Sequence, residues 1–599
     1  MSEGAILISA MVGLFLGPTL LWVLGRRSWW LEFVDGYILF SVGGIALCYL
    51  LPKSLVNGGV WAGAAACLGA GLPHVLQKRF LKAQGAVLFL FLLGLLLHSA
   101  FDGAALALPS EDHQDHLQIS VLLQHFPIGL VVFWAFSQRL QVWKAFGLVG
   151  LLALVTLVGY ASAGTLDGFS SSRALILFEA FIVGVLLHVL VHARTWVYGQ
   201  SYGVDKDGSR EALFPRTMAF LGALLGVMTF LELGHGAELL PSSEGSLEFW
   251  PTALALIRVS APTFLLAYVL VSIFSILFAP WASRRLQGGT HLSHGFKGVW
   301  YGFFTPLSPR DVLSRYSALI RSGAPVTIAL AFLLATSGLA LEALLISVPL
   351  LGNFLTGARF FAAIIVALVV AWTVGQSLAA RSQEFSLDKE STVGWGDRVL
   401  RGFRFGFGEL VDHTLPWALL GLGVAALMEP LLEPTTSPTP DAWGLIRSIP
   451  NALHVPLAAT LGFPFYICGA GATLVGAIVL HKGLSAGPVL AFLLLAPVLN
   501  TTTMSAISSY HGRGTAIRVG AIAFVVAVWV GWFVDLIFGG GGLDLRASVD
   551  GASSSLEDFS LIVLAGLCTL SLFRQGLRGF LGRVFRARHG HEERDVHAH

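Results

Sequence analysis

One stretch of the chain occurs twice, and this repeat constrains the fold more than any other feature of the sequence. Residues 302–372 align without a gap with residues 462–532, at a shift of 160 positions. Both copies contain the run Leu-Ala-Phe-Leu-Leu, at 330–334 and again at 490–494. Ungapped register over so long a stretch indicates an internal duplication. In membrane proteins, such repeats are typical of cores that hold a small molecule where the two copies meet.

The composition indicates that the chain lies in a membrane. Of its 599 residues, 55% are hydrophobic and only 12% are charged, which is typical of polytopic membrane proteins. We expect an all-α protein with about 15 transmembrane helices plus two re-entrant hairpins in an inverted repeat, because in lipid only a helix satisfies its own backbone groups within one segment. The four cysteines all lie in apolar runs, so no disulfide framework is predicted.

The hairpins are predicted from two apolar pieces, at 303–322 and 463–481, that Gly, Pro or charged residues interrupt. Lys and Arg gather in alternate loops, which marks those loops as cytoplasmic. The basic loop 381–404 fits this pattern only if the first piece does not cross, and the basic tail at 574–588 only if neither piece crosses. We therefore predict two inverted copies, an N-terminus outside and a cytoplasmic C-terminus, in a bacterial inner membrane.

This topology makes a direct prediction for the basic loop. A cysteine in place of Ser391 should resist an impermeant thiol reagent added to intact cells, because the loop is expected to face the cytoplasm. Labelling should appear only after the cells are permeabilised. Ready labelling of intact cells would contradict the inverted arrangement.

Three regions follow from these patterns. Residues 1–240 form an expected membrane domain of eight helices, and residues 241–575 a two-repeat domain with repeats at about 252–380 and 412–540. A basic, His-rich cytoplasmic tail is predicted at 576–599. Histidine-rich tracts are often associated with metal binding.

The second copy carries a specific motif. Its hairpin contains Cys468 and ends at Lys482-Gly483, and the helix that follows ends in the pattern Pro497-x-x-Asn500. Over about 252–540 this pattern resembles the predicted permease family related to arsenic permeases, particularly members described as copper/zinc efflux permeases. The resemblance implies that Cys468, Lys482 and Asn500 line a substrate site.

The first copy departs from that pattern. Ser308 lies where the relatives carry a Cys-x-Cys, and Ser337 and Ala340 lie where they carry Pro and Asn. One hairpin thiol therefore remains, and a single thiolate does not select copper or zinc by itself. Glu342 and Arg310 are charged residues within apolar pieces, which makes them functional candidates by default. A compensating structural ion pair is the alternative.

The first half resembles a different family. His98 and Asp102 are four residues apart, hence on one face of a helix, and Gly103 follows. A later span contains His125 and Gly129. Over about 1–235 these positions resemble the ZIP family of metal transporters, which implies a metal site of His98, Asp102 and His125. Three ligands are enough for one zinc with an open position, and a scaffold or regulatory role for this half is the alternative.

Together these features predict a permease that exports a transition-metal ion or a metalloid species, with zinc or another divalent metal as substrate. The predicted substrate-binding residues are Cys468, Asn500, Glu342, Lys482 and Arg310. Two alternatives remain open: a transporter of small inorganic or organic anions, attracted by helix N-termini and Arg310 or Lys482, and a metal-sensing membrane protein that transports nothing. The chain contains no nucleotide-binding loop or hydrolase motif, so we do not expect an enzyme. The expected partners are the lipid bilayer and the small substrate, without nucleic acid, and a homo-oligomer is compatible with the sequence.

Overall fold

The computed structural model is helical throughout, with no strand among the residues that it describes. They divide into two compact units, unit 1 within Met1–Ser246 and unit 2 within Leu247–Leu432 and Trp443–His599. Each unit is described by itself. The structure describes residues 3–24, 28–79, 84–107, 115–137, 140–162, 173–198, 213–235, 249–277, 286, 289–305, 307, 309–378, 394–432, 444, 446, 448–462, 467–538, 555–576 and 579–580.

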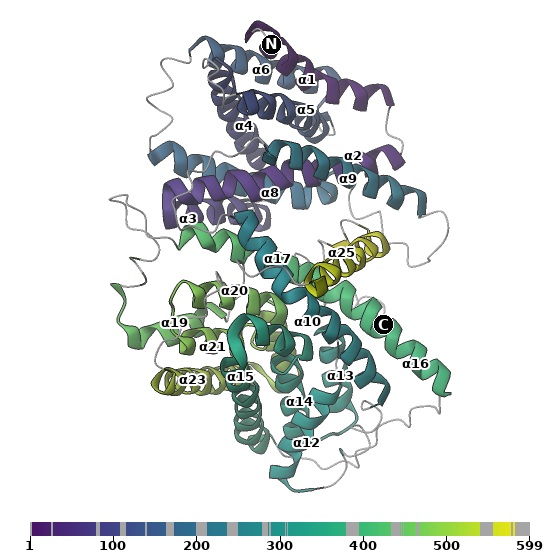
Figure 1. The fold of residues 1–599 in the computed structure, drawn as a ribbon, viewed down its shortest axis with the longest axis vertical. Helices are drawn as coiled ribbons and strands as arrows, with labels where there is room; N and C mark the ends of the chain where they lie inside the picture. Colours follow the sequence, from purple (N-terminus) through teal and green to yellow (C-terminus); the bar gives the residue numbers. More distant parts are fainter. Residues whose placement is uncertain are drawn as a thin grey trace. The chain divides into compact units, whose positions relative to one another are not determined.

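Unit 1 is a set of antiparallel and crossing helices coloured purple to blue in Figure 1. Its elements pack chiefly in pairs: α1 with α5, α2 with α9, α3 with α8, and α4 with α6. Their bounds are α1 Glu3–Leu24, α2 Ser28–Ile45, the π-helical turn η1 Ala46–Leu50, α3 Leu51–Arg79, α4 Gln84–Leu106, α5 Asp115–Ser137, α6 Val142–Ala161, α8 Arg173–Tyr198 and α9 Leu213–His235.

Glycines bring the backbones of these paired helices into direct contact. A Cβ atom added to Gly159 of α6 would collide with the carbonyl oxygen of Ala100 in α4, and one added to Gly103 would collide with the carbonyl oxygen of Thr156. Small residues at such crossings are the usual means by which membrane helices pack closely. The same reciprocal arrangement joins the other pairs through Gly36 and Gly222, Gly69 and Gly184, and Gly17 and Gly129. Gly103 and Gly129, which contributed to the ZIP resemblance, thus have a packing role.

Unit 2 contains the duplicated segment and the helices that accompany it, coloured teal to yellow in Figure 1. Helices α10, α17 and α25 pack against one another, and α10 also contacts α15 of the first copy. The bounds are α10 Phe249–Leu277, α12 His291–Phe304, α13 Pro309–Arg321, α14 Val326–Gly338, α15 Leu341–Ser377, α16 Trp395–Arg404, η4 Phe405–Leu410, α17 Val411–Leu431, α19 Asn451–Gly462, α20 Gly469–His481, α21 Ala486–Leu495, α22 Thr501–His511, α23 Arg513–Ile537 and α25 Ser555–Gln575.

The duplication in the sequence is also a duplication of helices. Helices α12, α13, α14 and α15 begin 160 positions before α19, α20, α21 and α22, respectively. A tertiary hydrogen bond recurs at the same shift: Trp372 Nε1 donates to Leu292 O at 3.2 Å, and Trp532 Nε1 donates to Ala452 O at 3.0 Å. The two copies therefore share the same helix starts and the same tertiary hydrogen bond.

The two copies also bend at equivalent glycines. Gly352 lies within α15 with φ 80° and ψ 164°, and Gly512 separates α22 from α23 with φ 83° and ψ 159°. Gly323 and Gly483, with φ 81° and 95°, end α13 and α20. Side chains other than glycine rarely adopt a positive φ, so these positions fix where each helix must end or bend.

The helix breaks differ in one respect from the prediction. The apolar run 326–348, which contains the first Leu-Ala-Phe-Leu-Leu segment, is long enough to predict one complete span. In the structure α14 ends at Gly338 and the long helix α15 begins at Leu341. Helices α13 and α14 are 13 residues each, too short to cross a bilayer, which takes about 20 residues. The break was missed because the first copy lacks the Pro and Asn that mark the corresponding break after α21.

Seven of the described helical stretches are long and apolar enough to cross a membrane, by length and composition. The predicted count of about 15 spans is not confirmed, since several apolar helices are shorter than 18 residues where they are described. Ser391 and most of the His-rich tail lie outside the described residues.

Candidate substrate site

Four helices of the duplicated segment begin at one pocket of about 130 Å³ in unit 2. It is lined by residues at or just before the start of α13, α15, α20 and α22, namely Leu307, Ala340, Cys468 and Asn500. A helix N-terminus carries a partial positive charge and unpaired N–H groups. The convergence of four of them gives this pocket a positive potential from the backbone alone.

Both copies contribute equivalent positions to the pocket wall. Three pairs of lining residues are related by the shift of 160 positions: Ser337 and Pro497, Ala340 and Asn500, and Glu342 and Thr502. The pocket therefore lies where the two copies meet, which is where the repeat predicts a site. The members of each pair differ chemically, so the pocket is symmetric in backbone and asymmetric in side chains.

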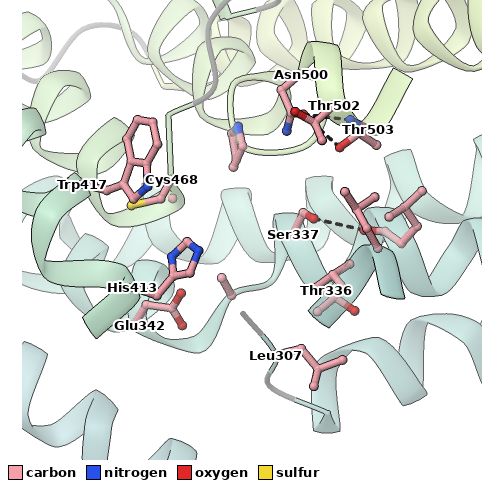
Figure 2. Close-up of a pocket in the computed structure, with 16 residues that line it drawn as sticks. Leu307, Thr336, Ser337, Glu342, His413, Trp417, Cys468, Asn500, Thr502 and Thr503 are labelled. Carbon is pink, nitrogen blue, oxygen red and sulfur yellow. Dashed lines mark hydrogen bonds between the residues drawn. The ribbon is translucent and has the colours of Figure 1, made fainter. Parts of the chain in front are cut away.

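Figure 2 shows two chemically different sides of the pocket. Glu342, His413, Trp417 and Cys468 lie on one side, and Ser337, Asn500, Thr502 and Thr503 lie on the other. His413 and Trp417 come from α17, outside the duplicated stretch, and the sequence analysis missed them. Helix α17 approaches closely because Gly421 contacts Gly471 at the start of α20, where a Cβ would lie 2.4 Å from the Gly471 Cα.

Two predicted residues act as caps in the second copy. Cys468 precedes α20, and its Sγ accepts a hydrogen bond from Gly471 N at 3.5 Å. Asn500 precedes α22, and its Oδ1 accepts from Thr503 N at 2.9 Å and from Thr503 Oγ1 at 3.2 Å. Its counterpart Ala340 makes no side-chain cap. Their roles as caps fix the orientation of the thiol and the amide at the pocket.

Arg359 of α15 is a further polar residue that the sequence analysis missed. It is 1% exposed, and its Nη1 donates to Ser347 Oγ and to Thr473 Oγ1, both at 2.7 Å. The guanidinium interacts electrostatically with Glu342, which lines the pocket. A single arginine in the middle of an apolar helix was the signal that could have identified it.

The five predicted substrate residues are not all brought together. Glu342, Cys468 and Asn500 line the pocket. Lys482 lies at the C-terminal end of α20, the opposite end from Cys468, and is therefore misplaced as a lining residue. Arg310 lies in the first turn of α13, and its side chain is outside the described part.

Unit 1 contains a separate polar group around α4. His98 Nε2 lies 3.5 Å from Asp102 Oδ2, and Glu179 of α8 interacts electrostatically with both and with Lys53. His125 of α5 is buried at 1% exposure. Within the described ranges, no group of three or more His, Cys, Asp and Glu side chains is placed to hold a metal ion. The three-ligand metal site of His98, Asp102 and His125 stays a prediction.

A duplicated bundle with interrupted helices around a polar pocket is the organisation of a membrane transporter core. Residues 251–536 match the model of a family described as predicted permease, and this range contains both copies. With its several apolar helices, the chain is a multi-pass membrane protein, and one region of it is similar to the predicted permease family. The comparison with curated proteins found no match, nor did the comparison with solved structures. The ZIP resemblance of unit 1 is unsupported by these comparisons.

Proposed function

We propose that unit 2 is a permease that moves a small oxyanion, metalloid oxyanions included, through the pocket between its two copies. The observation that carries this proposal is the convergence of four helix N-termini on one cavity. Partial positive charges and free N–H groups at helix N-termini favour anions and oppose cations. Asn500 and Thr502 add side-chain donors for substrate oxygen atoms.

A transition-metal ion is the second candidate, because three residue types that bind such metals line the pocket. Cys468, His413 and Glu342 lie on the same side in Figure 2, and thiolate, imidazole and carboxylate all bind zinc. In the described residues, however, the three side chains are not placed to hold one ion together. The positive helix ends oppose a bare cation at this position. A metalloid species reconciles the two sets of groups, since its oxygen atoms suit the donors and its central atom suits the thiol.

The arrangement in the membrane is part of the proposal. Helices α13–α14 and α20–α21 would form the two re-entrant hairpins, since each arm is too short to cross. Non-helical backbone at membrane depth is tolerated where it lines a wet cavity, and the pocket supplies such a cavity. We retain inverted copies, an N-terminus outside, a cytoplasmic C-terminus and export as the direction, with unit 1 as a scaffold or regulatory module.

Uptake into inside-out vesicles tests the function. Vesicles with the full chain should accumulate arsenate or selenite above empty-vector vesicles, and should not accumulate Zn²⁺ or Cu⁺. Because the second copy carries the polar caps, Cys468→Ala and Asn500→Ala should lower the initial rate more than Ser308→Ala or Ala340→Gly. Selective accumulation of zinc or copper would favour the metal cation.

A growth assay supplies an independent measure. Deletion of the chain should sensitise cells to the oxyanion that the vesicles accumulate, and a plasmid copy should restore tolerance. Unchanged tolerance together with no vesicle flux for any compound would leave a sensor without transport as the remaining alternative.

A further inference from the structure

We propose that Arg359 binds the substrate oxyanion directly and that the carboxylate of Glu342 takes up a proton when the anion binds. This inference rests on the proposed function. It names the groups that would select the substrate and couple its binding to the uptake of a proton. It follows from three features: unpartnered N–H groups on Arg359, a pocket-lining glycine close to them, and a carboxylate that lines the same pocket.

The first feature is an incompletely paired buried guanidinium. Arg359 is among the largest fully buried side chains described. Nη1 is bonded to Ser347 and Thr473, but neither Nε nor Nη2 has a hydrogen-bond partner within the described part of the chain. Buried charged groups are normally paired and hydrogen-bonded. The free Nε–H and Nη2–H groups form one edge of the planar fork that binds two oxygen atoms of an oxyanion.

The second feature is a pocket-lining glycine close to this edge, with Ala343 beside it. Gly469 lines the cavity, and a Cβ placed on it would lie 3.5 Å from Arg359 Nη2 and 2.7 Å from the Ala343 Cβ. Gly469 is also the first residue of α20. An oxyanion in the pocket at Gly469 would lie at the N–H groups of the start of α20. It would reach the guanidinium once Ala343 shifts, because a methyl group at this point already overlaps the Ala343 Cβ.

The third feature is the carboxylate of Glu342, which lines the pocket in the first turn of α15 and interacts electrostatically with Arg359. An oxyanion at Arg359 would lie beside this carboxylate, and two like charges at one site oppose each other. Transfer of one proton from water to the Glu342 carboxylate removes that repulsion and leaves an O–H donor for the anion. Anion binding and proton uptake are then coupled.

The other titratable groups near Glu342 are on neighbouring helices. Cys468 precedes α20 and His413 lies on α17; both line the pocket. Tyr268 of α10 interacts electrostatically with Glu342 and donates to or accepts from Thr414 at 2.9 Å. Helices α14 and α22 present Thr336, Ser337, Thr502 and Thr503. His413 is thus the group from which the proton-binding role of Glu342 must be distinguished.

Arg359 and Glu342 occur in the first copy of the repeat only. At the shift of 160 positions, Arg359 corresponds to Val519 and Glu342 corresponds to Thr502. The adjacent Arg518 is exposed and bonds to Ser377 and Thr515. One guanidinium at the meeting point of two copies provides one anion site per chain.

Isothermal titration of the purified full-length protein in detergent tests the proposal, with arsenate, selenite and sulfate as probes. Two buffers of different ionisation enthalpy report the protons taken up per anion. Arg359→Gln should weaken binding by about tenfold to a hundredfold, because hydrogen bonds to a charged group are lost. Arg359→Lys should retain part of the affinity, and Arg518→Gln should behave as wild type.

The second set of variants tests Glu342. Glu342→Gln should bind the anion at least as tightly as wild type, without proton uptake and with little change in affinity between about pH 6 and about pH 8. In His413→Gln the number of protons taken up per bound anion should persist, whatever the affinity of that variant. Loss of proton uptake in His413→Gln with retention in Glu342→Gln would overturn the role of Glu342.

A variant that leaves Arg359 in place separates the loss of anion binding from misfolding. The double variant Gly469→Ala with Ala343→Gly places a methyl group between the pocket and Nη2 while it relieves the contact with Ala343. It should bind the anion about tenfold more weakly at unchanged thermal stability. Wild-type affinity in this variant and in Arg359→Gln would overturn the binding role of Arg359. A wild-type chain that neither binds nor transports any probe would instead overturn the proposed function.

Discussion

Replacing Gly159 with leucine should remove most of the folded protein. At this position a Cβ would collide with the backbone carbonyl oxygen of Ala100, which cannot move away as a flexible side chain would. The helices α4 and α6 must separate, and the reciprocal contact of Gly103 with Thr156 is lost as well. We expect a destabilisation of about 3 kcal/mol, at the upper end for overpacked interiors. Fluorescence size-exclusion chromatography and thermal unfolding of the full chain in detergent measure the effect.

The same helix supplies the control. Gly147 of α6 is exposed, and a Cβ there would meet nothing within 4 Å. Gly147→Leu should therefore elute and unfold like wild type, or be slightly stabilised because leucine favours a helix more than glycine does. Equal stability of Gly159→Leu and Gly147→Leu would contradict the close contact between α4 and α6.

Replacing Asn500 with aspartate should abolish anion transport while the fold is retained. Asp and Asn cap helix N-termini about equally well, so the bond from Thr503 N to the side-chain oxygen is kept. The new carboxylate would lie in the pocket that the oxyanion must enter. Like charges placed together cost several kcal/mol, and about 3 kcal/mol corresponds to a loss of roughly a hundredfold in rate. Initial uptake rates in inside-out vesicles, with melting temperature as the stability measure, give the result.

Asn500→Ser is the matched control for this change, because serine also caps the helix and adds no charge. It should retain a measurable part of the oxyanion transport that Asn500→Asp loses. If Asn500→Asp instead gained uptake of Zn²⁺ or Cu⁺, the cation would become the favoured substrate. A carboxylate at this position thus distinguishes the two candidate substrates by the sign of their charge.

Several features of unit 2 could be predicted from the sequence, because both copies of the duplication keep the same local helix signals. Gly323 and Gly483 end equivalent helices, and the pattern around Cys468 and Asn500 identified two of the residues that line the pocket. The break before Leu341 was not readable, since Ala340 provides no cap and Ser337 is compatible with a helix. There the breakpoint is evident only from its equivalence to the second copy.

The side chains of the site show the same limit. Lys482 belongs to the same motif as Cys468, but a helix of 13 residues separates them by roughly 20 Å, at about 1.5 Å per residue. His413 and Trp417 reach the pocket from α17, whose approach depends on the contact between Gly421 and Gly471. No local pattern connects these distant segments.

By itself, the sequence determined that the chain is an all-helical membrane protein, that its core is duplicated at a shift of 160 positions, and that Cys468, Asn500 and Glu342 are site candidates. These properties follow from hydropathy, register and local helix signals, which neighbouring residues set. Only the tertiary structure decided that four helix N-termini meet at one cavity and that Arg359 lies behind Gly469. Both depend on which backbones can approach each other, and that is settled by packing between segments far apart in the chain.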